Sequence, residues 1–284
     1  MLDQETIDRV VTEALHEDAP TGDITSLLAI SEDATATAVL AAREPGTFAG
    51  AEVFEAAFRL TDPRITVELL KKDGDRFVPG DQLARVSGPA RGILTAERIG
   101  LNFTQRMSGI ATLTATYVDA IKGTDATILD TRKTTPNLRA FERHAVVCGG
   151  GTNHRLNLST AFMAKDNHLA VLLAGGKDLT TELQRVKTEL PAGVKFEVEV
   201  DRLDQIEPVI AGGVDIIMLD NFSLADLKTG VAQVAGRAVV EASGGVNLDT
   251  VRAIAETGVD VISVGALTHS ARALDLGLDV TIDS

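Results

Sequence analysis

Six basic side chains lie close together in the sequence, interleaved with glycines, hydroxyls and histidines. They are Arg132, Lys133, Arg139, Arg143, Arg155 and Lys165. Arginine presents a planar fork that binds carboxylate or phosphate with two parallel hydrogen bonds, and lysine supplies a compact point charge. Because the formal net charge is -14, this local cluster predicts a site for a small molecule with more than one kind of anionic group. The alternative is a solvated basic face.

Two glutamates alternate with apolar residues in the segment FEVEV, residues 196–200. The period of a strand places Glu197 and Glu199 on one face, which we expect to be the barrel interior. Asp220 follows the next predicted strand, and together with Glu199 it can hold Mg2+, because this ion takes few protein carboxylates plus substrate phosphates. The alternative for both glutamates is an ion pair with Lys133 or Lys165.

Glycines follow two late predicted strands. Ser243-Gly244-Gly245 and Gly265-Ala266 offer backbone N–H groups that a phosphate can approach, since no Cβ intrudes. Barrels often build a phosphate site from such late turns, although ordinary tight turns have the same pattern. His269 follows the second turn and could contact phosphate or cap local structure.

The other histidines and the single cysteine carry weaker signals. His154 and His168 lie within basic motifs but lack metal-ligand spacing, so we expect hydrogen-bond or acid–base roles. His144 lies on a predicted surface helix. Cys148 is expected to be a small loop residue rather than a nucleophile, because no neighbouring motif would activate it.

Short apolar runs alternate with helical patterns after residue 123. The runs are 126–129, 162–164, 196–200, 216–219, 239–242 and 261–264, and the helical patterns are 179–190, 203–211, 224–234 and 248–257. This alternation indicates βαβ units around a parallel sheet or barrel. Each run leads into polar or glycine residues, where barrel enzymes build their active sites.

The earlier part of the chain has a different texture. Strand-like runs at 35–42, 65–71 and 82–86 are separated by turn signals, which predicts a small sheet domain with accompanying helices. Residues 95–122 form one or two helices that bridge the domains, with Gly109 as a candidate break.

Composition excludes several classes of protein. The acidic balance, with pI about 4.8, argues against nonspecific binding to nucleic acid or anionic membranes. The first residues lack a secretion signal, and no apolar run is long enough to span a bilayer. A lone cysteine fits a reducing compartment, so we expect a cytoplasmic protein. Without Trp and with 4% aromatic residues, the core is expected to be aliphatic.

Motifs along nearly the whole chain match one family. They are Glu17-Asp18, Gly22-Asp23-Ile24-Thr25, Glu97-Arg98, Leu101-Asn102-Phe103, Gln105-Arg106-Met107-Ser108-Gly109, Thr131-Arg132-Lys133-Thr134-Thr135-Pro136, Asn153-His154-Arg155, Lys165-Asp166-Asn167-His168, Leu219-Asp220-Asn221-Phe222 and Ser243-Gly244-Gly245. In this order they closely resemble the quinolinate phosphoribosyltransferases. The resemblance implies the α/β type II phosphoribosyltransferase fold: an N-terminal open-faced α/β sandwich domain (residues 1–109) and a C-terminal incomplete α/β barrel (110–284), whose tail can pack back on the first domain.

The resemblance also implies a reaction and a site. Quinolinate and phosphoribosyl pyrophosphate would give nicotinate mononucleotide, pyrophosphate and carbon dioxide, with Mg2+ as cofactor and a homodimer, or a higher oligomer, sharing its active sites. Quinolinate would be bound by Arg106 of the neighbouring subunit together with Thr131, Arg132, His154, Arg155 and Lys165. Lys133, Glu199 and Asp220 would serve pyrophosphate and Mg2+; Lys165 would protonate the ring; and Ser243, Gly244, Gly245, Gly265, Ala266 and His269 would bind the 5'-phosphate.

Two positions depart from the family pattern, and two other functions compete. Asn137 replaces a usual glycine, a mild change because asparagine tolerates positive φ, and Thr160 replaces a common aspartate. One alternative is a homologue with an altered substrate, such as those of molybdenum transport loci. The other is a non-catalytic phosphometabolite sensor, against which Lys133, Glu199 and Asp220 argue.

Overall fold

The computed structural model describes residues 2–283 and divides them into two compact units. Unit 1 combines residues 2–115, 134–150 and 267–283, and unit 2 combines 116–133 and 151–266. The chain therefore passes between the units several times instead of crossing once.

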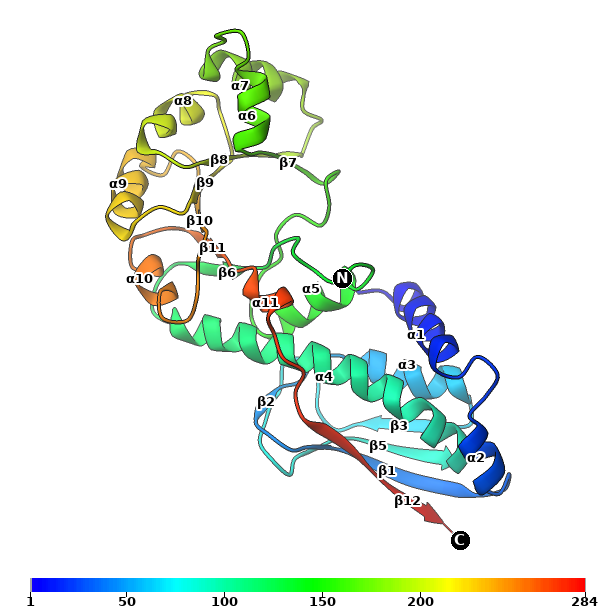
Figure 1. Cartoon of the computed structure of the whole chain (residues 1–284). Coiled ribbons are helices and arrows are strands. Elements are labelled where there is room, and N and C mark those ends of the chain that lie inside the picture. Colours follow the sequence, from blue (N-terminus) through cyan, green and yellow to red (C-terminus); the bar gives the residue numbers. More distant parts are fainter. Residues whose placement is uncertain (1, 284) are drawn as a thin grey trace. The chain divides into compact units, whose positions relative to one another are not determined.

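Unit 1 is built on an antiparallel sheet in the order β12-β1-β5-β3. Its strands are β1 (Thr35–Ala42), β3 (Thr66–Leu69), β5 (Gln82–Pro89) and β12 (Leu276–Asp283), and a small second sheet pairs β2 (Gly46–Thr47) with β4 (Arg76–Phe77). Ala36, Ala38 and Leu40 of β1 are buried, whereas Thr35 and Thr37 are exposed. Helices cover one face of the sheet (Figure 1). This is the open-faced sandwich that was predicted.

The helices of unit 1 bury an aromatic layer that composition did not predict. They are α1 (Gln4–Asp18), α2 (Ile24–Ala29), α3 (Ala51–Thr61), most of α4 (Ala90–Ala120) and α5 (Arg139–Cys148). Phe48, Phe54, Phe58 and Phe141 are fully buried. The core is mainly aliphatic, as expected, but the few aromatic residues are concentrated inside rather than spread over the surface.

Helix α4 runs for 31 residues without a break at Gly109. A Cβ at this position would lie 1.9 Å from the carbonyl oxygen of Arg272. The amide of Leu274 donates to the carbonyl of Gln105 at 3.0 Å, so the returning chain lies directly against the helix. Gly109 therefore permits close packing, which offsets the roughly 1 kcal/mol that a helical glycine costs. The candidate break was wrong.

Unit 2 is built on a six-stranded parallel sheet in the order β6-β11-β10-β9-β8-β7. The strands are β6 (Thr127–Leu129), β7 (Ala161–Ala164), β8 (Lys195–Val200), β9 (Ile216–Asp220), β10 (Val239–Ser243) and β11 (Val261–Ser263). The first strand joins the last, while β6 and β7 stay at opposite edges of this sheet. Each strand matches a predicted run, and the barrel is incomplete as expected.

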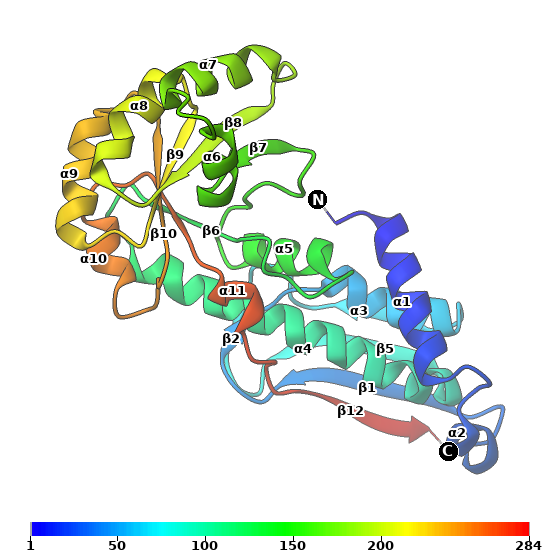
Figure 2. The same ribbon diagram turned by 45° about the horizontal axis from the view of Figure 1, so that its top comes forward.

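Helices connect the strands of unit 2 and lie outside the curved sheet (Figure 2). They are α6 (Asp166–Leu172), α7 (Leu179–Glu189), the 3-10 turn η1 (Leu203–Gln205), α8 (Ile206–Ala211), α9 (Leu224–Val234) and α10 (Val251–Ala255); α11 (Ala266–His269) leads back to unit 1. Helix α10 starts later than predicted, because Asn247 Oδ1 accepts the amides of Asp249 and Thr250 in a turn. Among residues 2–283, no helix has the length and apolar character needed to cross a membrane.

Candidate active site

The carboxyl ends of the parallel strands in unit 2 carry most of the predicted site residues. Lys165 directly follows β7, Asp220 ends β9 and Ser243 ends β10. Asp220 and Ser243 are paired in the strand register. Because all six strands run the same way, these ends share one edge of the sheet, the usual place for chemistry in such folds.

Lys165 and Glu199 form an ion pair at this edge. Ala164 of β7 pairs with Val198 of β8, so the residues that follow these two positions are neighbours. Glu199 is mostly buried, with 14% of its side chain exposed, and Lys165 remains 43% exposed. The ion pair that we considered as an alternative for Glu199 is present, and it leaves the lysine accessible.

The turns after β9 and β10 interlock. Asn221 adopts a φ of +58° and donates from Nδ2 to Asp220 Oδ2 at 2.6 Å. Gly244 has a φ of +92°, and a Cβ there would lie 2.2 Å from Asn221 Oδ1. A Cβ at Gly245, which has a φ of +60°, would have no atom within 4 Å. Gly244 is therefore required for packing against Asn221, whereas the space beside Gly245 is open, as a phosphate site requires.

Arg132 and Arg155 bring two guanidinium groups into one region of unit 2. Burial lowers the pKa of Arg155, and the positive charge of Arg132 lowers it further, against the opposing charge of Glu197. Arg132 Nε is buried and has no hydrogen-bond partner among the described residues. Two like charges held together with an unused donor form an arrangement that an anionic ligand would stabilise.

The side chains of His154, Glu197 and Glu241 form a buried cluster in unit 2. His154 Nε2 lies 3.2 Å from Glu197 Oε2 and 3.4 Å from Glu241 Oε2. Both glutamates are almost fully buried. Ser263 donates from its hydroxyl to Glu241, and the backbone amide of His154 donates to Asp130 Oδ1 at 2.7 Å. Two glutamates thus contact the imidazole directly, while Ser263 supports Glu241 and Asp130 holds the backbone of His154.

The charges of this cluster act on one another. Burial alone would lower the pKa of His154, but the hydrogen bonds and charges of Glu197 and Glu241 outweigh it and raise the pKa to about 10. The Arg155 amide opposes this, because it donates to Nδ1 at 2.7 Å, which requires that nitrogen to be unprotonated. Burial raises the pKa of Glu197. The cluster therefore retains more protons at neutral pH than the same groups would in water.

Glu241 was missed from the sequence, and the lysine ion pair considered as an alternative for Glu197 is replaced by a contact with His154. Glu241 lies inside the apolar run 239–242, which we interpreted as an ordinary strand. The available signal was the run itself, since an acid in an otherwise apolar buried strand requires a partner in the interior. That partner comes from residue 154, far away in the sequence, so the pairing could not be read from spacing.

Arg106 lies in unit 1, on α4, and makes three hydrogen bonds. Its guanidinium donates to the carbonyls of Ala271, at 2.7 Å, and Thr268, and to Glu142 Oε1 at 2.9 Å. Glu142 is fully buried and also accepts from the amide and hydroxyl of Thr135. About 31% of the Arg106 side chain is exposed.

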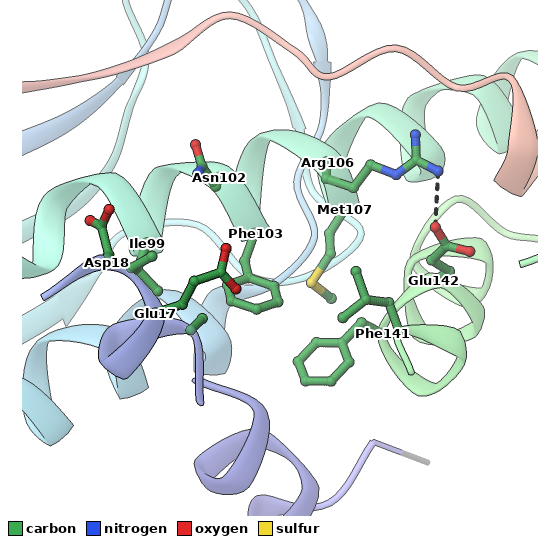
Figure 3. A pocket seen from close by; sticks show the side chains of 11 residues that line it. Glu17, Asp18, Ile99, Asn102, Phe103, Arg106, Met107, Phe141 and Glu142 are labelled. Carbon is green, nitrogen blue, oxygen red and sulfur yellow. Dashed lines mark hydrogen bonds and ion pairs between the residues drawn. The ribbon is translucent and has the colours of Figure 1, made fainter. Parts of the chain in front are cut away.

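A pocket of about 270 Å³ lies beside Arg106 in unit 1 (Figure 3). Its apolar lining includes Phe103 and Phe141, whose rings stack at 5.4 Å. Glu17 and Asp18 at the end of α1 also line it. The motif residues of α1 and α4 therefore meet at one concave surface, although they are about 90 positions apart in the sequence.

Other predicted residues have local roles in the structure. His168 Nδ1 accepts from the amide of Lys165 at 3.2 Å and so caps α6. His269 is exposed and lies 2.7 Å from the Ser270 hydroxyl; it belongs to unit 1, whereas Gly265 and Ala266 belong to unit 2. The amide of Lys133 donates to Thr131 Oγ1 at 3.1 Å.

The six basic residues of the predicted anion site are divided between the two units, and so are the two departures from the family pattern. Arg139 and Arg143 lie on α5 in unit 1, apart from the four basic residues of unit 2. Asn137 has a φ of +66°, which confirms that this position requires the left-handed region. Thr160 is exposed and bonds only with Asn157 nearby.

Comparison with known proteins identifies the class to which this fold and site belong. The family models for the N-terminal and C-terminal domains of quinolinate phosphoribosyl transferase match residues 23–108 and 110–279. The chain belongs to the quinolinate phosphoribosyltransferase family.

Individual relatives align over nearly the whole length of the chain. The carboxylating nicotinate-nucleotide pyrophosphorylase of Mycobacterium leprae (strain TN) is 42% identical over 278 residues, 95% of each chain. A probable enzyme of the same name from Bacillus subtilis (strain 168) is 40% identical and covers 94% of this chain and 91% of its own. The crystal structure of NadC from Streptococcus pyogenes superposes with a TM-score of 0.94 at 40% identity, covering 100% of this chain and 99% of that one.

Proposed function

We propose that this protein transfers the phosphoribosyl group of phosphoribosyl pyrophosphate to quinolinate. The pyridine nitrogen forms a bond to C1 of the ribose as pyrophosphate leaves, and the carboxylate at C2 then departs as carbon dioxide. A proton takes its place and gives nicotinate mononucleotide. Membership of the family supports the reaction. The observation that carries the site is the Arg132–Arg155 pair with its unused buried donor.

Quinolinate suits this pair because it brings two carboxylates. Arg132 and Arg155 would bind them, and the two carboxylates would offset the repulsion between the guanidinium groups. His154 positions Arg155, because its Nδ1 accepts a hydrogen bond from the Arg155 amide. Lys165, whose side chain is 43% exposed, is the proton donor to C2, where the ribosylated ring nitrogen stabilises the carbanion.

Lys133 and the glycine turns bind the phosphoribosyl pyrophosphate. The amides of residues 243–245 and 265–266 contact the 5'-phosphate, and Lys133 stabilises charge on the departing pyrophosphate. Glu199 and Asp220 suit Mg2+, because they offer carboxylate oxygens on neighbouring strands at the carboxyl end of the sheet. Mg2+ bound there would neutralise pyrophosphate oxygens and lower the cost of their release.

We further propose a homodimer in which Arg106 completes the site of its partner. The three bonds that Arg106 makes within its own chain use three of its five N–H groups, so two are left for a carboxylate. The lone cysteine, which fits a reducing environment, supports the cytoplasm as the place of reaction.

A single assay tests the function. Purified protein with phosphoribosyl pyrophosphate and Mg2+ should form nicotinate mononucleotide from quinolinate, and nicotinate should turn over at least about a hundredfold more slowly, because one carboxylate leaves a buried guanidinium unpaired. Comparable turnover of nicotinate would contradict the assignment of substrate. Binding of phosphoribosyl pyrophosphate without product from either acid would favour a sensor instead.

A further inference from the structure

Three side chains with metal-binding atoms meet in unit 1. Asp73 lies in the loop between β3 and β4, and His144 and Cys148 lie four residues apart on α5. One ligand atom of each lies within 4.8 Å of the other two. Residues at this spacing share a helix face one turn apart, so both side chains of α5 point toward the same loop.

Asp73 is held in place by the backbone of a third element. Its Oδ1 accepts from the amides of Gly50 and Ala51, at 2.9 and 3.0 Å, where α3 begins. Its Oδ2 lies 2.5 Å from His144 Nε2. One carboxylate oxygen is thus fixed by two amides while the other faces the helix, which is the kind of outer support that orients a metal ligand.

We propose that Asp73, His144 and Cys148 form a site for a single Zn2+ ion. Carboxylate oxygen, imidazole nitrogen and thiolate sulfur are the three donor types that zinc accepts, and three protein ligands leave a fourth tetrahedral position for water. His144 and Asp73 are 29% and 23% exposed, so an ion from solvent can reach them. Zinc would join the loop, the start of α3 and the end of α5.

Charge explains why a cation is suited to this place. Burial raises the pKa of the Cys148 thiol to about 12, and the neighbouring Asp73 carboxylate contributes to this rise. A divalent cation bound between them attracts both anions, and the thiol loses its proton to solvent as the zinc–sulfur bond forms. The segment that follows α5 begins with the three glycines 149–151, so the ion would fix the point at which this stretch begins.

The single cysteine of the chain makes the test specific. Full-length protein freed of metal by a chelator is titrated with Co2+, a spectroscopic substitute for Zn2+. We expect one equivalent to give a sulfur-to-cobalt charge-transfer band in the near ultraviolet, which only Cys148 can supply. Adding Zn2+ should abolish the band and slow alkylation of Cys148 by iodoacetamide at least tenfold.

Variants identify the ligands. Cys148→Ser should lose the band, and His144→Gln should weaken cobalt binding at least about tenfold. The matched controls are Asp75→Asn, a carboxylate two residues from Asp73, and Asp220→Asn at the proposed Mg2+ site, and both should keep the band. Wild-type protein without a band, or a band that persists in Cys148→Ser, overturns the proposal, and the wild-type titration decides even if a variant does not fold.

Discussion

The two units use partly buried arginines differently. In unit 1, Arg106 meets a buried carboxylate and two carbonyls, and Glu142 in turn is fully bonded. In unit 2, Arg132 keeps a buried Nε without a partner beside the guanidinium of Arg155. Glu197 Oε1 is also buried without a hydrogen-bond partner among the described residues.

This contrast separates groups that hold the fold together from groups held ready for a ligand. Leaving a buried polar group unsatisfied costs about 1–3 kcal/mol, so such groups persist only where something else requires them. In unit 2 the unsatisfied donor belongs to Arg132, one of the two arginines that we propose to bind quinolinate. Removing arginines should therefore have opposite effects on stability in the two units.

The largest expected effect is on the paired arginines. Replacing both, in Arg132→Gln/Arg155→Gln, should lower kcat/KM for quinolinate at least about a hundredfold, since each charged hydrogen bond is worth roughly 1.5–3 kcal/mol and 1.36 kcal/mol is tenfold. The free energy of unfolding, measured with urea, should stay equal or rise by up to about 1 kcal/mol, because like charges are removed. A marked loss of stability would place these arginines with Arg106 as structural residues.

Removal of Arg106 should lower stability, unlike removal of the paired arginines, and it should also lower activity. Arg106→Gln leaves Glu142 buried without its charge partner, so we expect a loss of about 1–3 kcal/mol in unfolding free energy and at least tenfold in kcat/KM. Glu142→Gln serves as the structural control, since it also breaks the ion pair but leaves Arg106 in place.

Mixing two inactive homodimers tests the partner's role. Unfolding and remixing equal amounts of Arg106→Gln and Lys133→Ala makes about half the dimers mixed, each with one intact site and one doubly defective site. About a quarter of native activity should return. If subunits demonstrably exchange and activity does not return, Arg106 acts within its own subunit or only on the fold.

The histidine cluster of unit 2 should make stability depend on pH. The pKa of His154, raised to about 10, means that the folded state holds a proton that the unfolded chain loses near pH 6.5. The stabilisation is complete below pH 6.5 and is lost as pH rises to about 10, at no more than about 1.4 kcal/mol per pH unit for one proton. Urea unfolding at several pH values should show a smaller decline in Glu241→Gln. Identical slopes would contradict the role of Glu241.

The smallest expected effect is on an exposed pair of unit 1. Hydrogen bonds from Arg272, and then from the Asp275 amide, lower the pKa of Glu44 to about 2. This stabilisation is present above pH 4.5 and is lost as pH falls through 2. Because Arg272 is 68% exposed, we expect less than about 1 kcal/mol. Acid unfolding of Glu44→Gln should lack this component, and an unchanged acid profile would contradict the pairing.

Much of the fold followed from local pattern. The six apolar runs predicted in unit 2 correspond to six strands, because parallel strands that are buried on both faces have short apolar sequences. Strand β1 was predicted at its observed bounds. The prediction of a break at Gly109 was wrong because this position requires glycine for another reason. The carbonyl of Arg272, 163 positions later in the sequence, packs against it, and such a long-range contact cannot be inferred from neighbouring residues.

The site could be predicted where a motif or the end of a strand indicates the chemistry. It could not be predicted where the chemistry depends on which side chains meet in the folded structure. Placing Lys165 and Asp220 at strand ends needed only the alternation of elements. The partners of Glu197, and the presence of Glu241 in the same cluster, depend on which strand interiors face each other. His144 was interpreted as a plain surface residue, since Asp73 approaches it from a loop 71 positions earlier.

The pairing of β12 with β1 has a consequence for synthesis of the protein. Strand β1 pairs along its full length with residues 276–283, which leave the ribosome only after all of unit 2. Until then, one edge of β1 carries unpaired backbone groups, which are the usual sites of unwanted strand pairing. Domains commonly fold in the order of their synthesis, but here the earlier sheet is completed last. Chaperone protection during translation would therefore matter most for the first unit made.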